Sequence, residues 1–136
     1  MRISAKAEYA CLAVIALAER EHEDRPVPIR ELADAKGIPP SFLTQILLKL
    51  KVAGLVVSTR GSSGGYRLAR PPEEISLSQV LQIVDGYGLR SSDRDVPSAR
   101  VLAQVWNQIR ACETKVLSGT SIAKLLERSN AHNWVI

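Results

Sequence analysis

The chain has 136 residues, of which 46% are hydrophobic and 24% charged, with 18 Lys and Arg against 14 Asp and Glu. This length and composition fit one globular domain, or a small domain with a helical extension, and exclude a disordered chain. Two cysteines far apart exclude a disulfide scaffold and indicate a reducing compartment. The longest apolar run, nine residues at 10–18, is too short to cross a membrane, so we expect a cytoplasmic protein without membrane contact.

The acidic residues are unevenly distributed. Residues 35–72 contain no Asp or Glu, and the same stretch carries a set of basic residues: Lys36, Lys49, Lys51, Arg60, Arg67 and Arg70. A basic surface without acids fits a polyanion such as DNA. A face that is merely solvated is the alternative.

Three helices are predicted in the N-terminal part. Ser4 can cap a helix that runs to about Arg20 with one buried side. A charged loop at 22–28 leads to a short helix at 29–36, which Gly37 ends. After a tight turn, Pro40 or Ser41 opens a further helix that ends at Gly54.

The helix after Pro40 has one apolar and one polar side. Apolar residues recur at i, i+3, i+4 and i+7 and predict the buried side: Leu43, Ile46, Leu47 and Leu50. Two short helices joined by a tight turn form a helix-turn-helix, whose second helix enters the DNA major groove. The polar side offers the candidate DNA contacts: Ser41, Thr44, Gln45 and Lys49.

Two short strands are predicted next, at 55–59 and 66–69, around the glycine-rich segment 60–65. A nucleotide-binding P-loop would need a following helix and a lysine, and this segment has neither. A hairpin beside a helix-turn-helix is a wing. Its glycines let backbone amides approach a phosphate, and four side chains can add contacts: Arg60, Ser62, Ser63 and Arg67. A hairpin turn with no partner is the alternative.

The C-terminal part begins at a stiff boundary, Arg70-Pro71-Pro72. We therefore expect a DNA-binding domain at 1–72 and a helical dimerisation and sensing region at 73–136. Ser76 and Gln79 form the capping box of a helix that ends at Gly86. After a polar loop at 87–97, Ser98 caps a long helix that runs to about residue 117, and a short helix at 120–128 follows. The expected fold class is mainly α, a winged helix-turn-helix with a long C-terminal dimerisation helix.

The long helix carries apolar residues at alternating spacings of three and four: Leu102, Val105, Ile109, Cys112 and Val116. We call these five residues the seam. Such spacing suits packing against a partner helix. Packing within the same subunit is the alternative, because two heptads are short for a coiled coil.

These segments resemble the Rrf-two (Rrf2) family of bacterial regulators, which includes the iron–sulfur cluster regulator and the nitric-oxide-sensitive repressor. The resemblance covers roughly residues 1–86 and is carried by "AGLV", "RG..GGY.LAR" and "EI.L..V....DG" at these intervals. It implies a homodimeric winged helix-turn-helix transcription factor whose long helices cross to form the dimer.

The resemblance also implies which residues contact DNA. Bases would be contacted by Ser41, Thr44 and Gln45. The wing contributes Arg60, Ser62, Ser63, Gly64, Gly65 and Tyr66, and Lys6 and Tyr9 approach the DNA backbone. Many relatives carry Glu at the position of Thr44, and proline at that of Ser62 or Ser63. Threonine can serve several bases or touch a thymine methyl, so we expect a different operator preference.

The sensing chemistry departs further from the resemblance. Many relatives bind an iron–sulfur cluster through three cysteines in the loop and early long helix, whereas residues 87–110 contain none. We therefore expect no cofactor and no metal site. A mixed site of Glu8, Cys11, Cys112 and a residue from the other subunit is an alternative. A thiol redox switch at Cys11 and Cys112 is another, and simple burial of both thiols a third.

An enzyme is not expected. His22 and His132 lie in polar segments without a catalytic pattern, and the chain has no HExxH, GxSxG or Walker motif. We predict a transcriptional regulator, a repressor rather than an activator, that binds a pseudo-palindromic operator in double-stranded DNA as a homodimer. A winged-helix module that binds only protein is the alternative.

Overall fold

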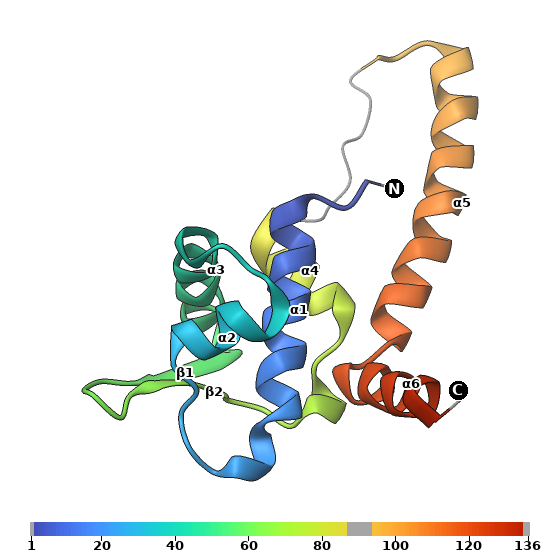
Figure 1. The fold of residues 1–136 in the computed structure, drawn as a ribbon. Helices are drawn as coiled ribbons and strands as arrows, with labels where there is room; N and C mark the ends of the chain where they lie inside the picture. Colours follow the sequence, from blue (N-terminus) through green and yellow to red (C-terminus); the bar gives the residue numbers. More distant parts are fainter. Residues whose placement is uncertain (1, 87–93, 135–136) are drawn as a thin grey trace.

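The computed structural model describes residues 2–86 and 94–134. Within these ranges the chain is mostly helical, with one antiparallel two-stranded hairpin. Figure 1 shows the elements, which are α1 Ala5–Glu19, the 3-10 turn η1 Glu21–Glu23, α2 Ile29–Lys36, α3 Pro40–Val52, β1 Val56–Thr59, β2 Gly65–Leu68, the 3-10 turn η2 Pro72–Glu74, α4 Leu77–Asp85, α5 Pro97–Gly119 and α6 Ile122–Trp134. This order confirms the predicted fold class.

The first three helices form as their sequence predicts. The Ser4 hydroxyl caps α1 by accepting a 3.0 Å hydrogen bond from the Ala7 amide. α2 ends at Gly37, whose φ of 65° is a conformation that glycine adopts without strain. Pro40 is the first residue of α3, where the missing amide hydrogen has no partner to lose. α2 and α3 with their short turn form the helix-turn-helix.

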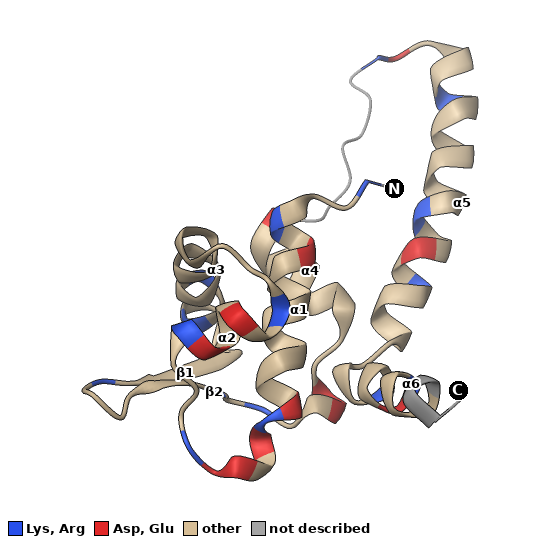
Figure 2. Ribbon diagram, in the orientation of Figure 1, with Lys and Arg blue, Asp and Glu red and all other residues tan. Residues whose placement is uncertain are grey.

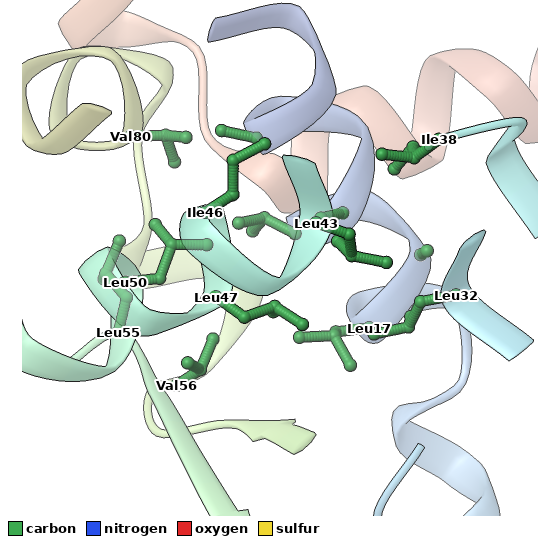
Figure 3. Packing of buried hydrophobic residues seen from close by; sticks show 14 of the residues in the cluster. Leu17, Leu32, Ile38, Leu43, Ile46, Leu47, Leu50, Leu55, Val56 and Val80 are labelled. Carbon is green, nitrogen blue, oxygen red and sulfur yellow. The ribbon is translucent and has the colours of Figure 1, made fainter. Parts of the chain in front are cut away.

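One side of α3 lies at the centre of the hydrophobic core. Its inward side chains are completely buried, as their spacing predicts: Leu43, Ile46, Leu47 and Leu50. Figure 3 shows them packed with residues of neighbouring elements, such as Leu17 and Val56. The same cluster contains Val80 of α4 and Ile122 of α6. The core therefore holds α3 rigidly and extends past residue 72.

The hairpin is tied to the loop before α2. Strands β1 and β2 pair from Val56–Leu68 to Thr59–Gly65. In addition, Val27 and Tyr66 exchange two backbone hydrogen bonds of 2.9 Å each, which nothing in the local sequence predicts. A side chain at Gly65 would lie 2.4 Å from the Val27 carbonyl, so only glycine permits this approach. The paired strands, here called the base of the wing, are therefore bonded along both edges of β2.

The later helices confirm some predicted ends and correct others. The capping box of Ser76 and Gln79 is formed, and Gly86 ends α4. The predicted cap at Ser98 is wrong, because the preceding Pro97 already occupies the first helical position, where proline is favoured, and Ser98 lies inside α5. The last helix begins at Ile122 and runs to Trp134, beyond the predicted 120–128. Its first turn is capped by Ser121, whose hydroxyl accepts from the Lys124 amide.

α5 stands at one side of the molecule, opposite α3 and the wing (Figure 1). Among the described residues of α5, Leu117 is buried, against Ala7 and Leu81. Part of the predicted loop 87–97, residues 87–93, lies outside the described ranges. No helix in the part that the structure describes is long and apolar enough to cross a membrane.

Candidate nucleic-acid interface

The polar side of α3 is open to solvent. All four residues predicted to contact DNA from this helix are exposed: Ser41, Thr44, Gln45 and Lys49. The buried side is held by the core, so the exposed side is presented on a rigid helix. The Lys49 ammonium reaches back toward α4 and lies 3.5 Å from the Val84 carbonyl oxygen. The helix thus offers small polar groups near its beginning and a positive charge further along.

Phe42 is a surface residue that the sequence analysis did not single out. It follows Ser41 in the first turn of α3 and keeps 45% of its surface exposed. Its ring contacts that of Tyr9, with centroids 5.8 Å apart. Tyr9 therefore joins the start of α3 to α1. An aromatic residue outside the i, i+3, i+4, i+7 pattern of the core was the signal that could have revealed it.

The tip and the base of the wing have different surroundings. Arg60, Ser62 and Ser63 are exposed at the tip. A side chain at Gly64 would lie 2.2 Å from the Thr59 carbonyl oxygen, so the tight turn at the tip needs glycine. At the base, Tyr66 is half-buried and bonded to Val27 (see above). The tip residues are therefore the ones free to touch a ligand.

Arg67 does not project freely from the wing. Its guanidinium donates a 3.0 Å hydrogen bond to the carboxylate of Asp24, in the loop between α1 and α2. This ion pair links β2 to residues 43 positions earlier in the chain. Together with the Val27 bridge it joins the hairpin to the segment between α1 and α2.

The acid-free segment remains basic after its ion pairs are counted. Lys36 pairs with Glu19 of α1, and Arg67 pairs with Asp24. Within the described ranges, no acid pairs with the remaining members: Lys49, Lys51, Arg60 and Arg70. Figure 2 shows that α3 and the wing carry only positive charges, whereas the acids lie on other elements, several of them in and beside η1. The uncompensated positive charge therefore lies on α3, on the wing and just after it.

The acids around η1 are largely neutralised by arginines. Arg20 and Arg25 both contact Glu23 and Glu31. The hydrogen bonds from Arg25 and Arg20 lower the pKa of the Glu31 carboxyl below its ordinary value. This cluster closes on itself, so it adds little net negative charge beside the basic surface.

Lys6, at the start of α1, lies beside Lys49 of α3. The neighbouring Lys49 side chain, with some loss of solvent contact, lowers the pKa of Lys6, while Asp85 opposes the shift. Two adjacent ammonium groups without an anion between them repel each other. A phosphate at this place would relieve the repulsion, as expected of a contact with the DNA backbone.

The seam of α5 faces solvent. Leu102, Val105, Ile109 and Val116 keep between 44% and 65% of their surface exposed, and Cys112 is exposed as well. Val101 and Trp106, beside the seam, are also exposed. Among the described residues the seam is not packed against the rest of its own subunit. The apolar side of α5 is available to a partner.

The two thiols have different surroundings. Cys11, on α1, packs toward Leu81 of α4. Burial is the largest cause that raises its thiol pKa to about 11, and the charges of Glu8 and Asp85 add to it. Cys112 is exposed on α5. It stands five residues before the buried Leu117, on a different side of the helix. Among the described residues, no three His, Cys, Asp or Glu side chains gather as metal ligands.

Comparison with known proteins identifies relatives that are similar in sequence and fold. Residues 3–128 match the model of the Rrf2 family, described as iron-dependent transcriptional regulators. A candidate helix-turn-helix regulator of Mycobacterium tuberculosis is 43% identical over 130 residues, covering 90% of this chain and 80% of that protein. The regulator IscR of Aliivibrio salmonicida is 41% identical over 131 residues, covering 93% and 77%.

Solved structures show the same fold. IscR of T. potens superposes with a TM-score of 0.80 at 29% identity, covering 95% of this chain and 88% of that one. CymR, the global cysteine regulator of B. subtilis, gives 0.81 at 28% identity, covering 94% and 98%. These likenesses fit a regulator and not an enzyme. The chain belongs to the Rrf2 family of helix-turn-helix transcriptional regulators.

Proposed function

We propose that the chain binds double-stranded DNA as a homodimer, with α3 of each subunit in the major groove and the wing against the backbone. The observation that carries this proposal is the acid-free surface of α3 and the wing tip, where positive charges lack acidic partners within the described ranges. Uncompensated Lys and Arg displace the counterions of DNA and so contribute affinity without sequence preference. A partner that is only protein would not need this charge distribution.

The residues divide into two groups by what they can contact. The exposed side chains near the start of α3 are assigned to base edges: Ser41, Thr44 and Gln45. Those assigned to the DNA backbone are Lys6, Tyr9, Lys49, Arg60, Ser62 and Ser63, with the backbone of Gly64 and Gly65. Tyr66 and Arg67 contribute by fixing the base of the wing.

The seam of α5 is assigned to the dimer. A second copy of the same apolar side would cover residues that are half-exposed in one subunit. A two-fold dimer presents two copies of α3 and therefore reads a pseudo-palindrome. The half-sites are expected about 10 base pairs, or a multiple of that, apart. Residues 1–72 would then bind DNA and residues 73–136 would dimerise, although both share one core.

The most direct test of base reading is Gln45→Ala, with Gln82→Ala on the exposed surface of α4 as the control. Affinity is measured by fluorescence anisotropy on a selected operator and on single-base variants. Gln45→Ala should lose about 1–3 kcal/mol of discrimination at one or two positions. An equal loss on every sequence would show that Gln45 does not read bases.

We also propose that the dimer represses transcription in the cytoplasm, where chromosomal DNA lies. A dimer bound across a promoter blocks the polymerase, and this needs no additional surface on the protein for contacting the polymerase. Transcription in vitro from a promoter that contains the operator should fall as protein is added. A rise in transcript would contradict repression.

The donor set of this chain does not fit a resident iron–sulfur cluster. Such clusters take four soft ligands, mostly thiolates. The chain has two cysteines, and Cys11 holds its proton at neutral pH. We propose regulation without a bound cluster; Cys112 belongs to the seam and would be covered in the proposed dimer. Protein purified without oxygen and without an affinity tag should be colourless and free of iron. Matched iron and sulfide would contradict this and direct mutagenesis to Glu8, Cys11 and Cys112.

A further inference from the structure

Thr44 presents a methyl group on the exposed side of α3. Its hydroxyl donates a 3.0 Å hydrogen bond to the Pro40 carbonyl oxygen, one turn earlier in the same helix. A threonine hydroxyl has a single proton to donate, and this bond uses it. The hydroxyl therefore has no proton left for a base acceptor, and the exposed side chain offers its methyl group and the lone pairs of its oxygen.

The apolar surface continues along the helix. Leu48 lies one turn after Thr44 on the same side and is 60% exposed. Val52, another turn on, is 82% exposed. These three residues form an apolar strip along the helix, separate from the exposed Phe42 in its first turn. Lys49 and Lys51 have no acidic partner within the described ranges, so the occupant must be anionic and yet carry an apolar group.

DNA meets both requirements in its major groove. The thymine methyl is the one apolar group at the base edges there, and phosphates line both sides. The first turns of a recognition helix reach the bases, while later turns leave the groove. Thr44 and Leu48 therefore lie within reach of base edges. Val52 lies in a later turn and is not assigned a contact with a base.

We infer that α3 reads thymine by apolar contact: the Thr44 methyl and the Leu48 side chain pack against the 5-methyl group of one thymine in each half-site. This inference rests on the proposed placement of α3 in the major groove. Gln45, beside Thr44, can pair with adenine at its N6 and N7 atoms. The preferred half-site therefore contains A·T pairs whose thymine methyl faces α3.

The test removes single methyl groups from DNA and protein. The wild-type chain first selects its site from random duplexes, and each thymine of that site is then replaced by deoxyuridine, which lacks only the methyl. At one thymine per half-site, replacement should weaken binding about fourfold, which is about 0.8 kcal/mol for one buried methyl. Replacement at the other thymines should change affinity little.

Two substitutions separate the methyl from the hydroxyl. Thr44→Ser keeps the hydroxyl and loses one of the two groups that pack on the thymine methyl, so the ratio between thymine and deoxyuridine should fall below fourfold. Thr44→Val keeps the methyl and should retain the fourfold ratio between thymine and deoxyuridine. Thr114→Ser on the exposed surface of α5 is the control, and its ratio should equal that of the wild type. Because Thr44 is exposed, all variants should give the circular dichroism spectrum of the wild type.

The outcomes are distinguishable. Sequence-selective binding with no thymine sensitive to deoxyuridine would overturn the inference and leave the proposed function intact. Retention of the ratio by Thr44→Ser with its loss in Thr44→Val would show that the hydroxyl reads the base, and would also overturn it. A wild-type chain that selects no sequence would overturn the proposed function and the inference with it.

Discussion

Placing a carboxylate in the seam should abolish the dimer while leaving the subunit folded. Ile109 lies on α5, outside the core, and is 48% exposed in one subunit. A dimer through the seam would bury the remaining half of this side chain. Ile109→Asp removes that burial and places two unpaired charges in the interface.

The magnitude follows from these two effects. Complete burial of an isoleucine contributes about 1.5–3 kcal/mol, so half of it contributes about 1 kcal/mol per subunit and about 2 kcal/mol per dimer. Ile109→Ala should lose this amount, a weakening of about 30-fold in dimer Kd. Each buried carboxylate costs several kcal/mol more, so Ile109→Asp should weaken the dimer by about 1,000-fold or more.

The assay is sedimentation velocity over a range of protein concentrations. Gln104→Asp adds the same charge to α5 away from the seam, and serves as the control because it should remain dimeric. Far-ultraviolet circular dichroism would establish that both variants remain helical. An Ile109→Asp dimer as tight as the wild type would refute the seam and require another interface.

Three more predictions concern the wing and the buried thiol. Arg60→Ala should weaken binding to all sequences and reduce the salt slope by about one per wing contact, unlike Arg128→Ala on α6; an unchanged slope in fluorescence anisotropy would remove Arg60 from the interface. Gly65→Ala should lower the free energy of unfolding by about 2–4 kcal/mol in urea, because the added carbon would lie 2.4 Å from the Val27 carbonyl and break two backbone hydrogen bonds. Ser63→Ala at the exposed tip is the control and should not lower it. Equal urea midpoints for the two variants would mean that the base of the wing can shift. The Cys11 thiol ionises less readily in the folded chain, where its pKa is raised from 9.0 to about 11. Its contribution to the free energy of unfolding is therefore fully present below pH 9 and falls by about 3 kcal/mol as the pH rises through 11. Cys11→Ala should lack this part of the decline, and identical pH profiles would contradict the assigned burial.

The parts of the fold that local patterns specify were predictable from the sequence. Caps at Ser4 and Ser76, the stop at Gly37 and the buried side of α3 each depend on residues within one or two turns. The wing was predictable because its glycines fall between two β-branched or aromatic runs. Ser98 is not the helix cap because the proline at position 97 already occupies the first helical position, so the helix begins before Ser98.

Contacts between distant segments were not predictable. Neither the Val27 bridge to Tyr66 nor the pairing of Arg67 with Asp24 leaves a periodic signal in the sequence. Composition placed Arg67 among the free positive charges, and the structure shows it paired. The same holds for Thr44, because only the structure shows that its hydroxyl proton is already donated to the Pro40 carbonyl oxygen.

The central claim is that two copies of the chain read a two-fold symmetric DNA sequence. The most direct measurement is selection of binding sites from random duplexes, followed by the mass of the complex on the selected site. The account predicts a pseudo-palindrome with half-sites about 10 base pairs or a multiple apart, occupied by two chains. A site without symmetry occupied by one chain, or the absence of any selected site, would contradict it.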